Sequence, residues 1–281
     1  MNTYRTTARI VGVLYLAGMV VGISGIILFQ SVLGAPDPLS AVSANSMLLA
    51  IGAILWLMAV VGDAAHGVLM FPVLKPHSER IAVGYLGFRI LDAAFIAIMV
   101  LFILVQIPIG SEYLKAGADA SYLQVLSNVF MRAQLDAYNL AMITLGVASL
   151  MLCYTLYRAK LVPRFLAVWG LVGYAIILCG SVLEVLGFGL LSIHAIPGGL
   201  WELFIGVWLI VKGFNPPAIV PEIQSAPRVL RGSIQPDLEE TDDVRQGLPD
   251  HRRPGADRQR VVGGAYLRQD RVRQTSGRTG L

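Results

Sequence analysis

The chain has 281 residues, of which 56% are hydrophobic and only 14% are charged. Soluble domains carry about 25% charged residues, so this composition argues against a soluble protein and indicates a membrane protein. The formal net charge of +4 is divided equally, because residues 1–220 and 221–281 each hold 11 Lys and Arg against 9 Asp and Glu. No part is therefore strongly basic, and we expect no nucleic-acid partner.

Six apolar segments are long enough to cross about 30 Å of hydrocarbon, which takes roughly 20 helical residues. None shows the alternation typical of a membrane β-strand. The pattern predicts an all-α domain over residues 1–218 that is a bundle of six transmembrane helices. The predicted spans are about 10–33, 47–74, 81–107, 133–157, 164–191 and 195–212. We expect the first to be a retained helix, because its apolar stretch is too long for a typical signal peptide.

Basic residues are concentrated in alternate loops of this arrangement. The strings “KPHSER” (75–80) and “RAKLVPR” (158–164) hold five Lys and Arg between them, whereas loops 34–46 and 192–194 hold none. The predicted loop 108–132 is longer and holds two. Since Lys and Arg are enriched in cytoplasmic loops, we expect both termini to face the cytoplasm.

Four polar residues lie inside the second and third predicted spans, where ionisable groups are candidates for function. Asp63 and His66 are three residues apart, as are Arg89 and Asp92, so each pair shares a helix face. Counted from the cytoplasmic ends, His66 and Arg89 lie about 12 Å deep and the two aspartates about 16 Å deep. A short loop joins the two helices and makes them neighbours. We therefore expect an inner polar layer of these four side chains.

A second set of polar residues lies nearer the opposite membrane face. It comprises Arg132, Asp136 and Asn139 on the fourth span, Glu184 on the fifth and Glu202 on the sixth. We expect these five to form an outer polar layer.

The two layers hold more acids than bases, with five carboxyl groups against two arginines and one histidine. In a bundle of low dielectric constant, surplus acids must be protonated, hydrated or matched by a bound cation. Alternatively, the arginines pair with the aspartates only to set the helix register, and Glu184 and Glu202 are neutral, hydrogen-bonded acids. Both interpretations remain open at this point.

Gly18 and Gly22 on the first span form a small-xxx-small pattern, “GMVVG”. Such a face permits close helix approach, either inside the bundle or in a homo-oligomer. Besides the lipid bilayer, a second copy of the chain is thus the one macromolecular partner to which the residues point.

Motifs for catalysis, cofactors or metals are missing from the sequence. There is no P-loop, dinucleotide-binding fingerprint or zincin motif. Asp63, His66 and Asp92 have no recognised metal-ligand spacing, and Cys153 and Cys179 fit two small buried apolar residues. We expect no catalytic residue, no metal and no cofactor.

Residues 219–281 contain eleven Arg, no Lys and few large apolar side chains. Such a segment cannot bury a core and is predicted to be a disordered cytoplasmic tail. Its bias toward Arg is also typical of GC-rich DNA translated out of frame. A third interpretation is an arginine-rich arm that meets anionic lipid or nucleic acid, although its nine acidic residues oppose strong attraction.

Four strings resemble a bacterial membrane family: “YRAKLVPRFLAVWGLVGY” (157–174), “WELFIGVWLIVKGFNPPA” (201–218), “ARIVGVLYLAGMVVGI” (8–23) and “HSERIAVGYLGFRILDA” (77–93). The family is the six-helix one catalogued as domain of unknown function 4386, and the resemblance covers about residues 5–218. It implies the six-helix topology and a multi-pass location in a bacterial cytoplasmic membrane. It implies no activity.

For function, the polar interior favours a small transporter- or channel-like protein that handles protons, a small cation or a solute. The alternative is a non-catalytic accessory, regulatory or structural membrane protein. An intramembrane enzyme ranks third, because the sequence offers no nucleophile–base pair or metal constellation.

Overall fold

The computed structural model describes residues 3–116, 120–190 and 193–215, and the predicted tail at 219–281 lies outside the described residues. Within the described part every regular element is a helix, which confirms the all-α class. The elements are α1 (Thr3–Leu33), α2 (Pro38–Ala44), α3 (Ser46–Leu74), α4 (Glu79–Ala116), α5 (Ser121–Arg158), α6 (Arg164–Val185), the 3₁₀ turn η2 (Ile193–Ala195) and α7 (Ile196–Val211).

Six of these segments are long and apolar enough to cross a membrane: α1, α3, α4, α5, α6, and α7 with the turn before it. The predicted number of spans is thus confirmed. Many large apolar side chains on their outer faces, such as Ile27, Val61 and Leu101, are exposed. Such exposure over whole helix faces is what a lipid-facing surface requires, and the chain is a multi-pass membrane protein.

Helices α4 and α5 are longer than the apolar runs that predict them. The predicted loop 108–132 is mostly helical, because α4 continues to Ala116 and α5 begins at Ser121. A contact of the α5 extension explains part of the difference: Ser127 Oγ donates a hydrogen bond of 2.7 Å to Oε1 of Gln106 on α4. A small apolar core also forms from Leu39 of α2, Ile109 and Leu123.

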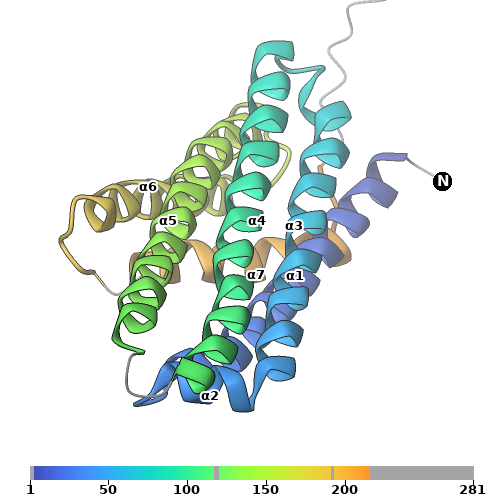
Figure 1. Ribbon diagram of the computed structural model, residues 1–281. Helices are drawn as coiled ribbons and strands as arrows, with labels where there is room; N and C mark the ends of the chain where they lie inside the picture. The colour runs from blue at the N-terminus through green and yellow to red at the C-terminus, as the bar shows by residue number, and fades with distance from the viewer. Residues whose placement is uncertain (1–2, 117–119, 191–192, 216–281) are drawn as a thin grey trace, which may run out of the picture. The chain divides into compact units, whose positions relative to one another are not determined.

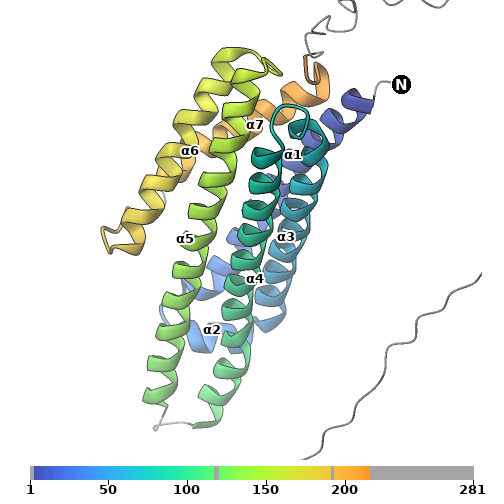
Figure 2. The ribbon, with the colours of Figure 1, turned by 90° about the horizontal axis from the view of Figure 1, so that it is seen from above.

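The long helices contact one another in a closed ring that follows chain order: α1 with α3, α3 with α4, α4 with α5, α5 with α6, α6 with α7, and α7 with α1. Figure 1 labels these helices, and Figure 2 shows α6, α5, α4 and α3 as a row with α1 and α7 on one side of it. This ring holds the candidate site in its interior.

Close glycine contacts close the ring on both sides of α1. A Cβ added at Gly12 would lie 2.6 Å from the Gly206 carbonyl oxygen on α7. One added at Gly25 would lie 3.0 Å from the Gly52 carbonyl oxygen on α3. These approaches, far below ordinary contact distance, let the backbones meet. The predicted motif glycines behave differently, because nothing lies within 4 Å of an added Cβ at Gly18 or Gly22.

Candidate functional site

A cavity of about 430 Å³ lies inside the ring, and side chains from α1, α3, α4, α5, α6 and α7 line it. Its size falls within the range of small-molecule pockets, about 300–1,000 Å³. The lining residues of α1 and α3 come from the middle of those helices, far from either end. The cavity therefore lies well inside the candidate membrane spans of α1 and α3.

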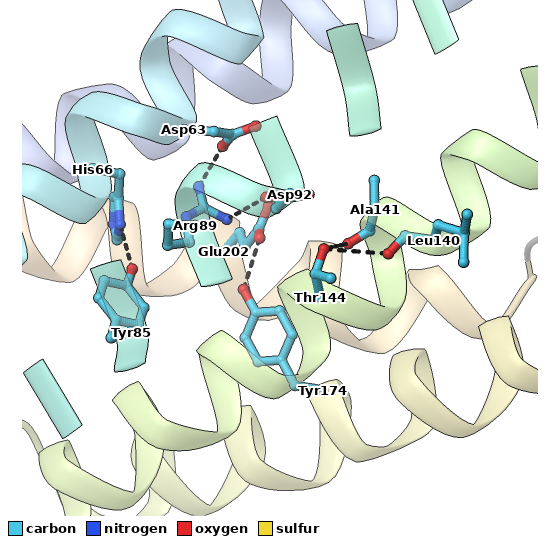
Figure 3. A network of polar contacts seen from close by, with 10 residues as sticks. All are labelled: Asp63, His66, Tyr85, Arg89, Asp92, Leu140, Ala141, Thr144, Tyr174 and Glu202. Carbon is cyan, nitrogen blue, oxygen red and sulfur yellow. Dashed lines mark hydrogen bonds and ion pairs between the residues drawn. The ribbon is translucent and has the colours of Figure 1, made fainter. Parts of the chain in front are cut away.

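Arg89 joins two carboxyl groups on the cavity wall (Figure 3). Its Nη1 donates to Asp92 Oδ2 at 3.1 Å on the same helix, and its Nη2 donates to Asp63 Oδ1 on α3. Asp92 is 1% exposed and Arg89 5% exposed, whereas the Asp63 side chain is 33% exposed. The i, i+3 spacing aims Arg89 and Asp92 to one side of α4, and the antiparallel α3 brings Asp63 to meet them.

Glu202 of α7 lines the same cavity. Its Oε1 accepts a hydrogen bond of 2.7 Å from the Tyr174 hydroxyl of α6. Sequence reasoning assigned this acid to the outer layer, and the structure differs. The predicted span 195–212 agrees with α7, so the difference arises from packing: α7 contacts α1 and α6 and thereby brings Glu202 to the same cavity as Asp63 and Asp92. The cavity thus holds three carboxyl groups, those of Asp63, Asp92 and Glu202, against one arginine.

His66 also lines the cavity, but its hydrogen bond goes to a tyrosine. Its Nδ1 lies 2.5 Å from the hydroxyl of Tyr85 on α4, and its ring packs edge-on against Tyr15 of α1 with centroids 4.5 Å apart. Within the described part of the chain, His66 Nε2 has no hydrogen-bond partner. His66 thus shares the cavity wall with Arg89, while its hydrogen bond goes to Tyr85, about one helical turn before Arg89 on α4.

Aromatic side chains complete the wall. Tyr15, Trp56 of α3 and Tyr138 of α5 line the cavity, and the last two pack edge to face with centroids 6.2 Å apart. Aromatic faces attract cations, so these side chains and the carboxyl groups favour the same kind of ligand, a cation. The sequence analysis does not predict these three residues. It does not predict Tyr85, the partner of His66, either, although the position of Tyr85 one turn before Arg89 on the same helix face is a signal that could have found it.

The other predicted outer residues do not form a single cluster. Arg132 and Asp136 form an ion pair of 3.2 Å along α5, with side chains 59% and 45% exposed. Asn139 is buried and its Oδ1 has no hydrogen-bond partner among the described residues. Glu184 is half-buried near the end of α6. None of these four lines the cavity.

A serine–histidine contact links α6 to the turn before α7. Ser181 Oγ lies 3.1 Å from His194 Nε2, and both residues are buried. Ser181 is 0% exposed, so this buried contact joins α6 to the turn before α7. Across the ranges that the structure describes, no group of three or more His, Cys, Asp or Glu is arranged to hold a metal ion.

Comparison with known proteins gives one match. A family model described as “Domain of unknown function (DUF4386)” matches residues 10–213. No curated protein and no solved structure matches the chain.

Proposed function

Because the chain belongs to the DUF4386 family, whose description assigns no activity, we propose a function from the cavity itself. The protein is a small transporter- or channel-like membrane protein that takes up protons or a small cationic solute inside its helix ring. Asp63, Asp92 and Glu202 are the proton- or cation-binding groups, and Arg89 is the fixed countercharge.

The observation that carries this proposal is the unequal charge on the cavity wall. Three carboxyl groups from three helices share the cavity with one arginine. A negative charge is costly in a medium of low dielectric constant unless it is paired or protonated. Arg89 can neutralise one of the three, so the others require protons or a bound cation. An arginine that only clamped α3 to α4 would need neither the third acid, Glu202, nor the cavity.

Its position in the membrane also supports the proposal. Substrate and ion sites of transporters are found near the bilayer midplane, between helices, and this cavity is lined by residues from the middle of α1 and α3. Asp63 is the exposed member of the ion-pair group, which leaves it open to whatever occupies the cavity.

We also propose that the protein lies in a bacterial cytoplasmic membrane with both termini inside. Figure 2 shows the start of α1, the α3–α4 turn and the α5–α6 turn at one end of the helix ring. The end of α7 lies there too, since the Asn215 N–H donates a hydrogen bond of 2.7 Å to the Leu161 carbonyl oxygen. The basic loops 75–80 and 158–164 therefore share one end, as the positive-inside rule requires of a cytoplasmic face.

Ion flux in liposomes tests the proposal. Purified protein in phosphatidylcholine liposomes is expected to dissipate an imposed proton gradient or to take up methylammonium. Neutralising Asp63→Asn and Glu202→Gln should abolish this flux. The matched control is Asp136→Asn, which neutralises an exposed acid outside the cavity and should leave the flux unchanged. Flux equal to that of protein-free liposomes would reject the proposal.

A non-catalytic accessory or structural protein is the alternative, and one observation favours it. Arg89 is bonded to Asp63 and Asp92 at once, as a pure helix clamp would be. A triple variant, Arg89→Leu with Asp63→Leu and Asp92→Leu, separates the two. If the three residues only clamp the helices, the triple variant should fold and behave like the wild-type protein. If they bind the transported ion, the variant should fold but lose the flux.

A further inference from the structure

Four glycines line the cavity without serving helix contact: Gly18 and Gly22 on α1, Gly62 on α3 and Gly199 on α7. Nothing lies within 4 Å of a Cβ added at any of them. Glycine weakens a helix relative to alanine, so its use at these positions needs a reason. Close helix packing is not that reason, because no neighbouring atom approaches them. What the four share is that each leaves the cavity wall open.

Three of these glycines, Gly18, Gly22 and Gly199, belong to α1 and α7, and we infer a gap between these two helices. The two helices meet at Gly12 and Gly206. Beyond this contact both contribute to the cavity lining, α1 with residues up to Ile26 and α7 with residues from Ile196. The helices therefore diverge from a point of contact and leave a wedge-shaped opening on one side of the cavity.

Apolar residues form the rim of this opening. Ile23 and Ile26 of α1, and Leu200 and Leu203 of α7, line the cavity and are also exposed. All four come from membrane-spanning segments. An exposed apolar rim is matched to hydrocarbon chains and poorly matched to water, so the opening faces the lipid and not an aqueous compartment.

Charged groups lie deeper in the cavity. Asp63 is partly exposed and Glu202 is half-buried. Asp92, at 1% exposure, has an Oδ1 without a hydrogen-bond partner among the described residues. Trp56 is likewise buried with an unpartnered Nε1. A ligand that fills the cavity from the lipid side meets acids and aromatic faces at its inner end and apolar side chains along its length.

We propose that the cavity takes an amphiphilic organic cation, a hydrophobic amine, directly from the bilayer through the gap between α1 and α7. The ammonium group contacts Asp63 and Glu202, with aromatic faces of Trp56 and Tyr138 beside it, and the apolar body lies along the glycine-bordered wall. An anionic amphiphile is disfavoured, because three carboxyl groups face it and the Arg89 guanidinium is already paired twice. This inference rests on the proposed cation-binding function and names its substrate class.

Binding of dodecylamine to the protein in phosphatidylcholine nanodiscs tests the inference. Radiolabelled dodecylamine should be retained above the level of empty nanodiscs, and dodecanoate, of equal chain length and opposite charge, should not. Gly22→Phe places an aromatic ring at the gap from a position where an added Cβ meets no neighbouring atom, and it should slow dodecylamine association by about tenfold or more. Gly87→Phe is the matched control, since Gly87 also has open space around it but does not line the cavity.

Methylammonium uptake makes the failure of this inference distinguishable from failure of the proposed function. Methylammonium flux that is present and depends on Asp63 and Glu202 supports the proposed function. Lateral access by an amphiphilic cation is overturned, and the proposed function stands, if in the same protein dodecylamine binds no better than dodecanoate or Gly22→Phe leaves the rate of dodecylamine association unchanged. If neither cation is bound or moved and an imposed proton gradient is not dissipated either, both are overturned. Gly18→Leu, at the same wall, replaces Gly22→Phe should the larger side chain unfold the protein.

Discussion

Removing Arg89 alone should destabilise the protein strongly, because two carboxyl groups lose their partner. Breaking a buried ion pair by deleting one side costs about 3–5 kcal/mol. Asp92, at 1% exposure, bears that cost in full. Asp63 is 33% exposed and is partly solvated or screened through the cavity, which places Arg89→Leu near the lower end, about 3 kcal/mol.

Unfolding in mixed detergent–SDS micelles, followed by circular dichroism, measures this free energy. Arg132→Leu is the control, since it breaks an exposed i, i+4 ion pair and should cost only about 0.3–0.5 kcal/mol. Leucine at all three positions, 63, 89 and 92, removes the unpaired charges as well and should restore stability to within about 1 kcal/mol of wild type. The reasoning is refuted if Arg89→Leu unfolds like Arg132→Leu, or if the triple variant is no more stable than Arg89→Leu.

Three further changes test the packing and hydrogen bonds around the cavity in the same unfolding assay. Gly25→Ala should cost about 1–3 kcal/mol through overpacking against α3, whereas Gly22→Ala should be neutral or stabilising; equal effects would contradict the described contacts. Tyr174→Phe removes the hydroxyl that donates to the α7 carboxyl group, and a loss of about 1–3 kcal/mol is expected. For Gln106→Leu and Ser127→Ala, a double-mutant cycle should show a coupling of at least about 0.5 kcal/mol, and additivity would argue against that hydrogen bond.

Much of the fold could be predicted because apolar run length reports directly on the membrane. Six runs predict six spans, and the short loop 75–80 predicts that α3 and α4 are neighbours. The spacing of Arg89 and Asp92, with the depth of Asp63 counted from the loop, predicts that the three polar groups lie near one another. Such arguments succeed because α3 and α4 pack antiparallel, so distance along one helix translates into distance along the other.

Other parts depend on helix tilt and on contacts between side chains, which run length does not encode. Hydropathy marks where hydrocarbon ends and not where a helix ends, so the continuation of α4 to Ala116 could not be found from it. The position of Glu202 beside the ion-pair group depends on the contacts of α7 with α1 and α6. Tyr15 has no polar neighbour in the sequence that would distinguish it from an ordinary core residue.

The ring of helices closes between the first helix and the last, where Gly12 meets Gly206. This has a consequence for biosynthesis, because the ribosome delivers α1 first and α7 at the end of the membrane domain. Until α7 inserts, Glu202 is missing and one side of α1 has only lipid for a neighbour. The cavity with its three carboxyl groups is therefore complete only once α7 has inserted, because Glu202 and the α7 part of the lining are delivered last.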